Sequence, residues 1–274
     1  MSVQISLGHG LEARLRRKLD SIYRRQIADR GARLNTAQPN LDASPSIERD
    51  RFLLLSYFEN HKKGPGIWKW LQYFDAYERH FARFRGTKVH ILEIGVFSGG
   101  SIEMWREYFG PEASIYGVDI QPACKCYEGP GVKIFIGDQA DRAFWQRFRQ
   151  EVLALDIVID DGGHTYEQQA TTLEELLPHL RAGGIYMCED VHGTFNYFTD
   201  YGLGLVRQLN AFHPGDPETM DNGARRIVVK ATPFQSMVHS IHFYPFLTVI
   251  ERNRAPVKEL LAPKYGTEWQ PYLS

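Results

Sequence analysis

The pattern of apolar and polar residues becomes regular from residue 89 onward. Short apolar runs alternate there with amphipathic stretches, which predicts strands and helices in turn. The run 157–159 is apolar throughout and suits a strand that is buried on both faces, as in a parallel sheet. The predicted strands cover 89–94, 114–118, 132–136, 155–159 and 184–188, and the predicted helices cover 100–109, 140–152 and 166–178.

The later part of the chain has a different pattern. A helix is predicted over 199–212, and a loop rich in Pro, Gly and Asp follows over 213–223. The segments 240–244 and 246–250 then predict two strands joined tightly at Pro245. The sequence therefore predicts an α/β fold in which a parallel sheet is closed by an antiparallel pair.

The N-terminal part predicts helices only. Leu11, Leu15, Leu19 and Ile22 recur at helical spacing opposite a basic face. We interpret this helix as a packing or dimer element with a solvated face, rather than as a membrane-surface helix. Further helices are predicted over 47–60 and 67–85, and the second of them is rich in aromatic residues.

Chain length, charge and cysteine content limit the classes of protein to which the chain could belong. The chain has 274 residues, with 32 Lys and Arg against 33 Asp and Glu, so no overall charge would recruit nucleic acid or an anionic membrane. No apolar run is long enough to span a bilayer, and no signal peptide is expected. Three cysteines without a C-x-x-C pair suit a reducing cytosol. We therefore expect a cytoplasmic protein with no nucleic-acid partner and no membrane span.

We expect three regions along the chain. Residues 1–86 would form a helical extension or lid, and residues 87–252 would form the cofactor-binding domain. Residues 253–274 would form a C-terminal tail. The amphipathic helix makes a homo-oligomer the expected assembly.

A glycine-rich turn follows the first predicted strand. It reads E-x-G-x-x-x-G-G from Glu93 to Gly100, and a helix begins at once. Phe97 stands where a dinucleotide-binding loop needs a glycine beside the pyrophosphate. Glu93 would repel phosphate but attract the cationic amine of a methionine, and Asp119 could accept hydrogen bonds from a ribose diol. The pattern therefore favours S-adenosylmethionine over a dinucleotide. The expected cofactor contacts are Glu93, Gly95, Ser98, Gly99, Asp119, Ile120, Asp138, Gln139 and Asp160.

Acidic residues end two predicted strands that we expect to be neighbours. Asp160 and Asp161 follow one strand, and Glu189 and Asp190 follow the next. Strands in a sheet lie about 4.8 Å apart, so these carboxylates would crowd one edge and repel each other. Either some are protonated, or they turn away, or a cation holds them together. Mg²⁺, which prefers oxygen ligands, is the expected cation, and zinc is disfavoured because no thiolate is well placed.

Two histidines follow these acids. An imidazole with a pKa near neutrality is the usual general base for a hydroxyl, and His164 lies three residues after Asp161. His192 is the competing candidate for this role. His239 and His242 lie in a predicted strand and are expected to be structural.

Together, these motifs resemble those of the metal-dependent sugar O-methyltransferases, a group that acts on macrolide deoxysugars and is similar in fold to cephalosporin-hydroxylase-like proteins. The resemblance covers about residues 50–252 and depends chiefly on the paired acidic motifs. It implies a Rossmann-like class I methyltransferase fold, with a mostly parallel seven-stranded sheet and a final antiparallel strand. It also implies that Asp161, Glu189 and Asp190 hold Mg²⁺ and that His164 is the base.

The expected reaction is methyl transfer from S-adenosylmethionine to a sugar hydroxyl. Two neighbouring acceptor oxygens, as in a vicinal diol, would reach Mg²⁺, and a saccharide or glycoside would be the substrate. A catechol-type O-methyltransferase is one alternative, because its acceptor is also a vicinal diol. The other is a cofactor-binding subunit without activity, whose N-terminal helix recruits a partner enzyme.

Overall fold

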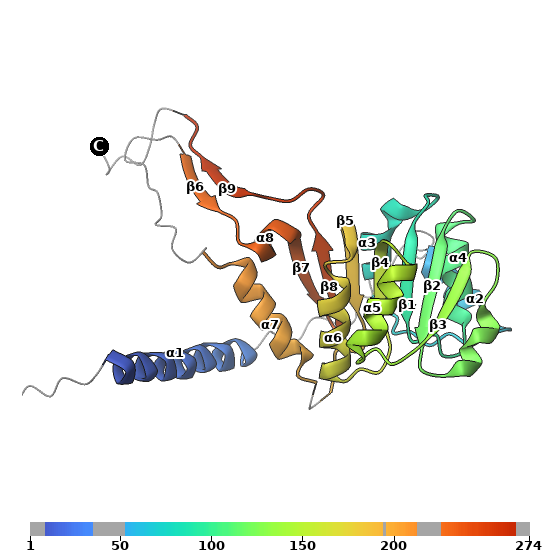
Figure 1. Cartoon of the computed structure of the whole chain (residues 1–274), viewed down its shortest axis with the longest axis horizontal. Coiled ribbons are helices and arrows are strands. Elements are labelled where there is room, and N and C mark those ends of the chain that lie inside the picture. Colours follow the sequence, from blue (N-terminus) through green and yellow to red (C-terminus); the bar gives the residue numbers. More distant parts are fainter. Residues whose placement is uncertain (1–8, 35–52, 194–195, 213–225, 267–274) are drawn as a thin grey trace, which may run out of the picture. The chain divides into compact units, whose positions relative to one another are not determined.

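The structure, a computed structural model, describes residues 9–34, 53–193, 196–212 and 226–266 (Figure 1). Backbone contacts divide the chain into two units, 1–47 and 48–274. The first unit contains helix α1 (His9–Ala32), which confirms the predicted N-terminal helix. Its described apolar side chains, such as Leu19 and Ile22, are exposed. Within the described residues, no helix has both the length and the apolar character needed to cross a membrane.

A seven-stranded sheet forms the centre of the second unit (Figure 1). Its strands are β1 (His90–Ile94), β2 (Ser114–Asp119), β3 (Val132–Ile136), β4 (Leu155–Asp160), β5 (Leu180–Cys188), β7 (Val238–Tyr244) and β8 (Leu247–Arg252). They are arranged in the order β3-β2-β1-β4-β5-β8-β7. The first five are parallel, and β8 runs antiparallel to both β5 and β7. The predicted strands and the closing antiparallel pair are therefore confirmed.

Helices cover both faces of this sheet because the buried strands are apolar on both sides. Along β4, Ile157 and Ile159 pack into one buried cluster and Val158 packs into the other. The first cluster includes α2 (Leu53–Asn60), α3 (Tyr73–Phe81) and α4 (Gly100–Phe109). The second includes α5 (Arg142–Glu151), α6 (Tyr166–Leu176) and α7 (Phe198–Leu209). The helices that a strand-end residue contacts therefore depend on the face of the sheet on which it lies.

The predicted helix over 67–85 is wrong in its first part. Residues 67–70 have no regular structure, a turn follows at 71–72, and only α3 and the 3-10 turn Ala82–Phe84 are helical. Lys69 and Trp70 instead bond to acidic residues beyond the sheet. These tertiary contacts outweigh the helical spacing of the aromatic residues.

A second, two-stranded sheet was not predicted. It pairs β6 (Arg226–Lys230) with β9 (Glu259–Pro263) in antiparallel fashion, and the short helix α8 (Pro233–Met237) follows β6. The strand β9 lies within the segment that was expected to be a tail. The predicted loop at 213–223 and the start of the helix predicted at 47–60 lie outside the described residues.

Candidate functional site

A cavity of about 630 Å³ lies at the carboxyl ends of the parallel strands. One part of its wall comes from the ends of β1, β2 and β3, and the other part comes from the ends of β4 and β5. The irregular segment before α3 contributes Trp68, Lys69 and Trp70. Open α/β sheets bind their ligands at this edge, so the cavity is the candidate active site.

The expected cofactor residues divide into two groups. Gly95, Asp119, Ile120, Asp138 and Gln139 line the cavity. The cavity wall does not include Glu93, Ser98, Gly99 or Asp160. The first group is therefore placed to contact a ligand directly. In the second group, Glu93, Gly99 and Asp160 are buried and Ser98 is half-buried.

Glu93 lies behind the wall because its side chain points under helix α4. It is fully buried, and its carboxylate accepts hydrogen bonds from the Ser101 hydroxyl (2.7 Å) and the Trp105 indole (3.1 Å). Burial raises the pKa of Glu93, although Lys69 opposes this effect. Glu93 therefore fixes the start of α4, and this position differs from the expected contact with a methionine amine.

Gly95 is required by the protein backbone itself. Its φ angle is +91°, and an added Cβ would lie 2.0 Å from the carbonyl oxygen of Asp161. Gly100 is similarly constrained, because its Cβ would lie 2.3 Å from the carbonyl oxygen of Pro65. These glycines let the loops after β1 and β4 and the segment before α3 approach one another.

Asp119 holds the glycine-rich turn in place at the cavity wall. Its Oδ2 accepts a hydrogen bond from the Phe97 amide (3.0 Å), and its Oδ1 accepts one from the Gln121 amide (2.8 Å). A carboxylate oxygen has a second lone pair, so Asp119 can still accept a hydrogen bond from a ligand hydroxyl. Phe97, at 74% exposure, presents its ring to the cavity.

Asp160 and Asp161 point to opposite faces of the sheet, since neighbouring side chains alternate along a strand. Asp160 is fully buried and accepts hydrogen bonds from the Gln139 amide (2.9 Å) and the Tyr186 hydroxyl (2.7 Å). Burial raises its pKa to about 7. The Gln139 Oε1 in turn accepts a hydrogen bond from the Gly163 amide (2.7 Å). The expectation that all four acids crowd together is therefore wrong for Asp160, which supports the loop from behind.

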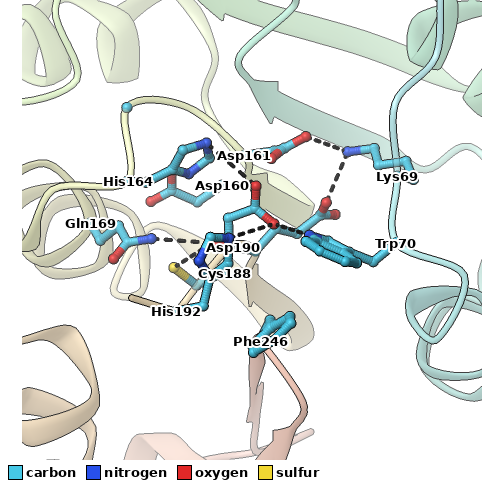
Figure 2. Close-up of polar contacts among 12 residues, drawn as sticks. Lys69, Trp70, Asp160, Asp161, His164, Gln169, Cys188, Asp190, His192 and Phe246 are labelled. Carbon is cyan, nitrogen blue, oxygen red and sulfur yellow. Dashed lines mark hydrogen bonds and ion pairs between the residues drawn. The ribbon is translucent and has the colours of Figure 1, made fainter. Parts of the chain in front are cut away.

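Glu93, Asp161 and Glu189 lie on the face that α3 covers, at the ends of three adjacent strands. The side chain of a single lysine lies among all three. The Lys69 ammonium lies 2.6 Å from Asp161 Oδ2, 2.9 Å from Glu189 Oε2 and 3.6 Å from Glu93 Oε1. Figure 2 shows Lys69 directed at Asp161 from the segment before α3. Burial alone would lower the pKa of Lys69, but the three carboxylates outweigh it and raise the pKa well above its usual value.

This lysine is the site residue that the motifs did not reveal. Its only sequence signal is a cation between Trp68 and Trp70, in an aromatic segment that otherwise resembles a packing helix. The expected cation among the acids was Mg²⁺, and the metal site stays a prediction. The cation that contacts Asp161 and Glu189 in the structure belongs to the chain itself.

Glu189 is the most enclosed of the expected metal ligands. Its side chain is 1% exposed, its Oε1 accepts a hydrogen bond from the Tyr77 hydroxyl (2.6 Å), and its Oε2 contacts Lys69. Burial raises the pKa of Glu189 above its usual value. Both of its oxygens are therefore already occupied by protein groups, and a metal ion would have to share one of them.

Asp190 faces the cavity from the end of β5. Its Oδ1 accepts hydrogen bonds from the Trp70 indole (3.0 Å) and the Tyr73 hydroxyl (2.9 Å). Its Oδ2 lies 3.6 Å from the His164 Nε2. Figure 2 shows Trp70 and His164 on either side of this carboxylate. Asp190 therefore keeps Oδ2 available to a ligand while its other oxygen is fixed.

The residues present fit a divalent cation on the cavity side. Asp161, His164 and Asp190 each offer a ligand atom within 4.8 Å of the other two. The side chains of Asp161 and Asp190 are 19% and 25% exposed, so they reach the cavity. Glu93, Asp161, Glu189 and Asp190 together carry more negative charge than the single ammonium of Lys69 balances. The structure thus brings Asp161 and Asp190 together and places Glu189 beneath them.

Backbone strain is concentrated around this cavity. Among the described residues, four non-glycine residues have a positive φ angle, namely Phe97, His164, Asp190 and Phe246. The first three line the cavity, and Phe246 packs against Trp70 and His192. Such conformations cost about 1–3 kcal/mol each and cluster at functional sites. Their position here supports the assignment of the cavity as the active site.

His192 also lines the cavity but is held differently from His164. Its Nε2 lies 4.0 Å from Asp190 Oδ1, and its ring makes edge contacts with Trp70 and Phe246. It therefore belongs to an aromatic wall beside Asp190.

Comparison with known proteins identifies relatives that are named as O-methyltransferases. Residues 92–191 match the family model described as a methyltransferase domain. The chain is 32% identical over 208 residues to the 8-demethyl-8-alpha-L-rhamnosyl tetracenomycin-C 2'-O-methyltransferase of Streptomyces olivaceus, covering 70% of this chain and 53% of that protein. It is 39% identical over 202 residues to the mycinamicin VI 2''-O-methyltransferase of Micromonospora griseorubida, covering 65% and 47%. The chain spans about half the length of these relatives.

A solved structure agrees with these relatives. The MycE methyltransferase from the mycinamycin biosynthetic pathway, in complex with Mg, SAH and mycinamycin VI, aligns with a TM-score of 0.58 and 27% identity over 75% of this chain and 54% of that one. The resemblance to sugar O-methyltransferases, inferred from the acidic motifs, is thereby confirmed. Residues 92–191 thus match a methyltransferase domain, and the chain has the Rossmann-like class I methyltransferase fold.

Proposed function

We propose that this protein transfers a methyl group from S-adenosylmethionine to a sugar hydroxyl of a glycosylated metabolite, with Mg²⁺ as a second cofactor. The observation that carries the proposal is the pairing of Asp161 and Asp190 beside His164 at the cavity. Two relatives, named as methyltransferases of a rhamnosyl tetracenomycin and of mycinamicin VI, support the acceptor class. The MycE complex, which contains Mg and SAH, supports both cofactors.

The strand ends on one side of the cavity suit S-adenosylmethionine. Asp119 would accept hydrogen bonds from the ribose hydroxyls, and Ile120 offers an apolar surface beside it. Asp138 and Gln139 would meet the adenine at the end of β3. Gly95 would lie near the methionine end, while Glu93, Ser98, Gly99 and Asp160 would support this wall from behind.

The other side of the cavity suits the acceptor. When bound, S-adenosylmethionine supplies an electrophilic methyl group, and Mg²⁺ supplies positive charge that makes a nearby hydroxyl more acidic. Asp161 and Asp190 would hold the cation from the cavity side, and Glu189 would support them. His164 would accept the hydroxyl proton, because its imidazole borders the cavity next to both carboxylates. Asp190 would stabilise the imidazolium that forms.

Assembly and location belong to the same proposal. We infer self-association from the exposed apolar side chains of α1, among them Leu19, Ile22 and Ile27. We infer a cytoplasmic location from the thiols of Cys124, Cys126 and Cys188, which are all free. Sedimentation of the full chain tests the first inference.

Methyl transfer from labelled cofactor tests the function. The full chain would be offered a rhamnosylated polyketide, a macrolide glycoside, the free sugar and a catechol. We expect label on a glycoside, loss of turnover in EDTA and recovery with excess Mg²⁺. Label on the catechol alone would select the catechol-type alternative, and cofactor binding without any transfer would select the non-catalytic subunit. Full turnover in EDTA would exclude the metal.

A further inference from the structure

A second group of metal-binding side chains lies away from the cavity. His80 on α3, His242 on β7 and Glu251 on β8 each offer one ligand atom within 4.8 Å of the others. Glu251 pairs with Ile185 along β5, whereas the strand end next to the acids, at Cys188, pairs with Thr248. The cluster is therefore set back from the active site along the sheet, on the face that α3 covers.

The contacts within the cluster are close and specific. The His80 Nδ1 lies 2.6 Å from Glu251 Oε1, and the His242 Nε2 lies 3.8 Å from the same oxygen. The rings of His80 and His242 are 4.8 Å apart between centroids. Two imidazole nitrogens therefore converge on one carboxylate oxygen from two different elements.

His80 can present a lone pair to a metal ion without losing its other contact. With Glu251 ionised, Nδ1 donates to Glu251 and Nε2 accepts from the Tyr244 hydroxyl, 3.0 Å away. A hydroxyl both donates and accepts, so the opposite tautomer would keep the bond to Tyr244. In that tautomer, Nδ1 has a free lone pair for a metal ion, and the Nε2–H donates to the Tyr244 hydroxyl. Metal-binding histidines usually donate their other ring N–H in this way.

His242 is suited to ligation by its exposure. Its side chain is 38% exposed, so an ion could enter from solvent. The Ser240 hydroxyl lies 3.0 Å from its Nε2 and would have to give up this contact.

Two positive charges, those of Arg83 and Arg79, oppose a metal ion at this place. Arg83 Nη1 lies 3.8 Å from Glu251, but on Oε2, the oxygen that the histidines do not share. Its Nη2 donates to the carbonyl oxygen of Gly183 (2.6 Å), which directs part of the guanidinium elsewhere. Glu251 Oε1 therefore contacts the two imidazoles, while the guanidinium lies at Oε2.

We propose that His80, His242 and Glu251 form a site for a divalent transition-metal ion of the zinc class, separate from the magnesium site. Two imidazoles and a carboxylate are typical ligands of such ions, whereas Mg²⁺ prefers oxygen ligands alone. The ion would clamp α3 to β7 and β8. Since α3 also carries Tyr73 and Tyr77, which bond to Asp190 and Glu189, the clamp would steady the wall of the active site.

Cobalt uptake by the full chain tests this proposal. The protein would be stripped with chelator, saturated with Mg²⁺ to fill the active site, and titrated with Co²⁺ while its visible absorption is followed. We expect about one equivalent of Co²⁺ to bind with visible bands that Zn²⁺ abolishes. His242→Ala should weaken this binding by at least about tenfold, since even changes behind the ligands cost that much. Glu251→Gln should weaken it as well.

Matched variants separate this site from others. His239→Ala removes an exposed histidine of the same strand and should bind Co²⁺ like the wild type. Asp161→Asn should also retain the binding, because it changes only the active site. The proposal is overturned if the magnesium-saturated wild type takes up no Co²⁺, if His242→Ala binds like the wild type, or if Asp161→Asn abolishes binding. Anomalous diffraction at the cobalt edge, with a peak expected among the three side chains, needs no variant to fold.

Discussion

The ammonium of Lys69 and the carboxylate of Asp161 lie 2.6 Å apart, and this contact joins two parts of the site that are far apart in the sequence. Lys69 belongs to the segment before α3, whose neighbouring Trp70 bonds to Asp190. Asp161 follows β4 and shares the lysine with Glu189. The chain thus supplies one cation of its own to the carboxylates of Asp161 and Glu189. The outer oxygens of Asp161 and Asp190 are left for a ligand in the cavity.

Replacing Lys69 tests how much it stabilises the fold through its contacts with the carboxylates of Asp161 and Glu189. Lys69→Met keeps an unbranched side chain but leaves buried carboxylates without a counter-charge. Removing one partner of a buried ion pair typically costs about 3–5 kcal/mol, so we expect a loss of this size in the free energy of unfolding, measured in urea without metal. Lys133→Met is the control, because its exposed pair with Glu151 is worth less than about 1 kcal/mol. Equal stability of the two variants would contradict the role of Lys69.

The two histidines beside Asp190 should differ in their effect on turnover. His164→Ala should lower kcat by about 10²–10⁴-fold, the usual contribution of a general base, while the affinity for S-adenosylmethionine stays unchanged. His192→Ala should act mainly on the KM of the acceptor, because its ring packs in the aromatic wall with Trp70 and Phe246. Steady-state kinetics with a glycoside acceptor measures both. A larger loss of kcat in His192→Ala would move the base to that residue.

Gly95 should tolerate no side chain. Gly95→Ala combines a φ angle of +91° with a Cβ placed 2.0 Å from the Asp161 carbonyl oxygen. Backbone strain of this kind costs about 1–3 kcal/mol, and relief of the clash would move the Asp161 loop. Gly204→Ala in α7 is the control, since nothing lies within 4 Å of its added Cβ, and it should stabilise the helix by up to about 1 kcal/mol. Thermal unfolding of both variants would decide, and a Gly95→Ala protein as stable as the control would contradict the account.

Burial of His179 predicts a pH dependence of stability far from the cavity. Burial lowers the pKa of His179 below its ordinary value of 6.5, and its Nε2 lies 2.7 Å from the carbonyl oxygen of Val152. The unfolded chain therefore binds this proton first, so the stability that the half-buried neutral imidazole provides is present above pH 6.5 and is lost as the pH falls toward its folded pKa.

Substitution isolates this contribution. His179→Gln keeps an N–H donor but cannot titrate, so it should lose less stability than the wild type as the pH falls below 6.5. Urea midpoints at several pH values measure the difference, with His239→Gln as the exposed control. Parallel pH curves for the wild type and His179→Gln would contradict the assignment.

Much of the fold follows from local patterns in the sequence. The interior of a buried strand such as β4 is apolar, as in residues 157–159, and the strand ends place the acids at one edge. The sheet and the candidate site were therefore both predictable. The face that each acid occupies follows from alternation along the strand. Asp160 and Asp161 are adjacent in the chain, and this alternation alone is enough to send them to opposite faces.

The remaining features depend on contacts between distant residues. Lys69 contacts Asp161 and Glu189 because the segment before α3 is not helical. No local spacing in the sequence indicates this. The position of Glu93 depends likewise on Ser101 and Trp105 of the following helix. Periodicity describes which residues are buried, but it does not identify the partner that each buried charge will find.

We propose that Asp161 and Asp190 hold a divalent cation at the cavity, above the carboxylates that Lys69 contacts. Anomalous diffraction from crystals of the full chain soaked in Mn²⁺, a substitute for Mg²⁺, tests it most directly. We expect a manganese peak in contact with both carboxylates in the wild type and no such peak in Asp161→Asn. A wild-type map with no peak between Asp161 and Asp190 would contradict it.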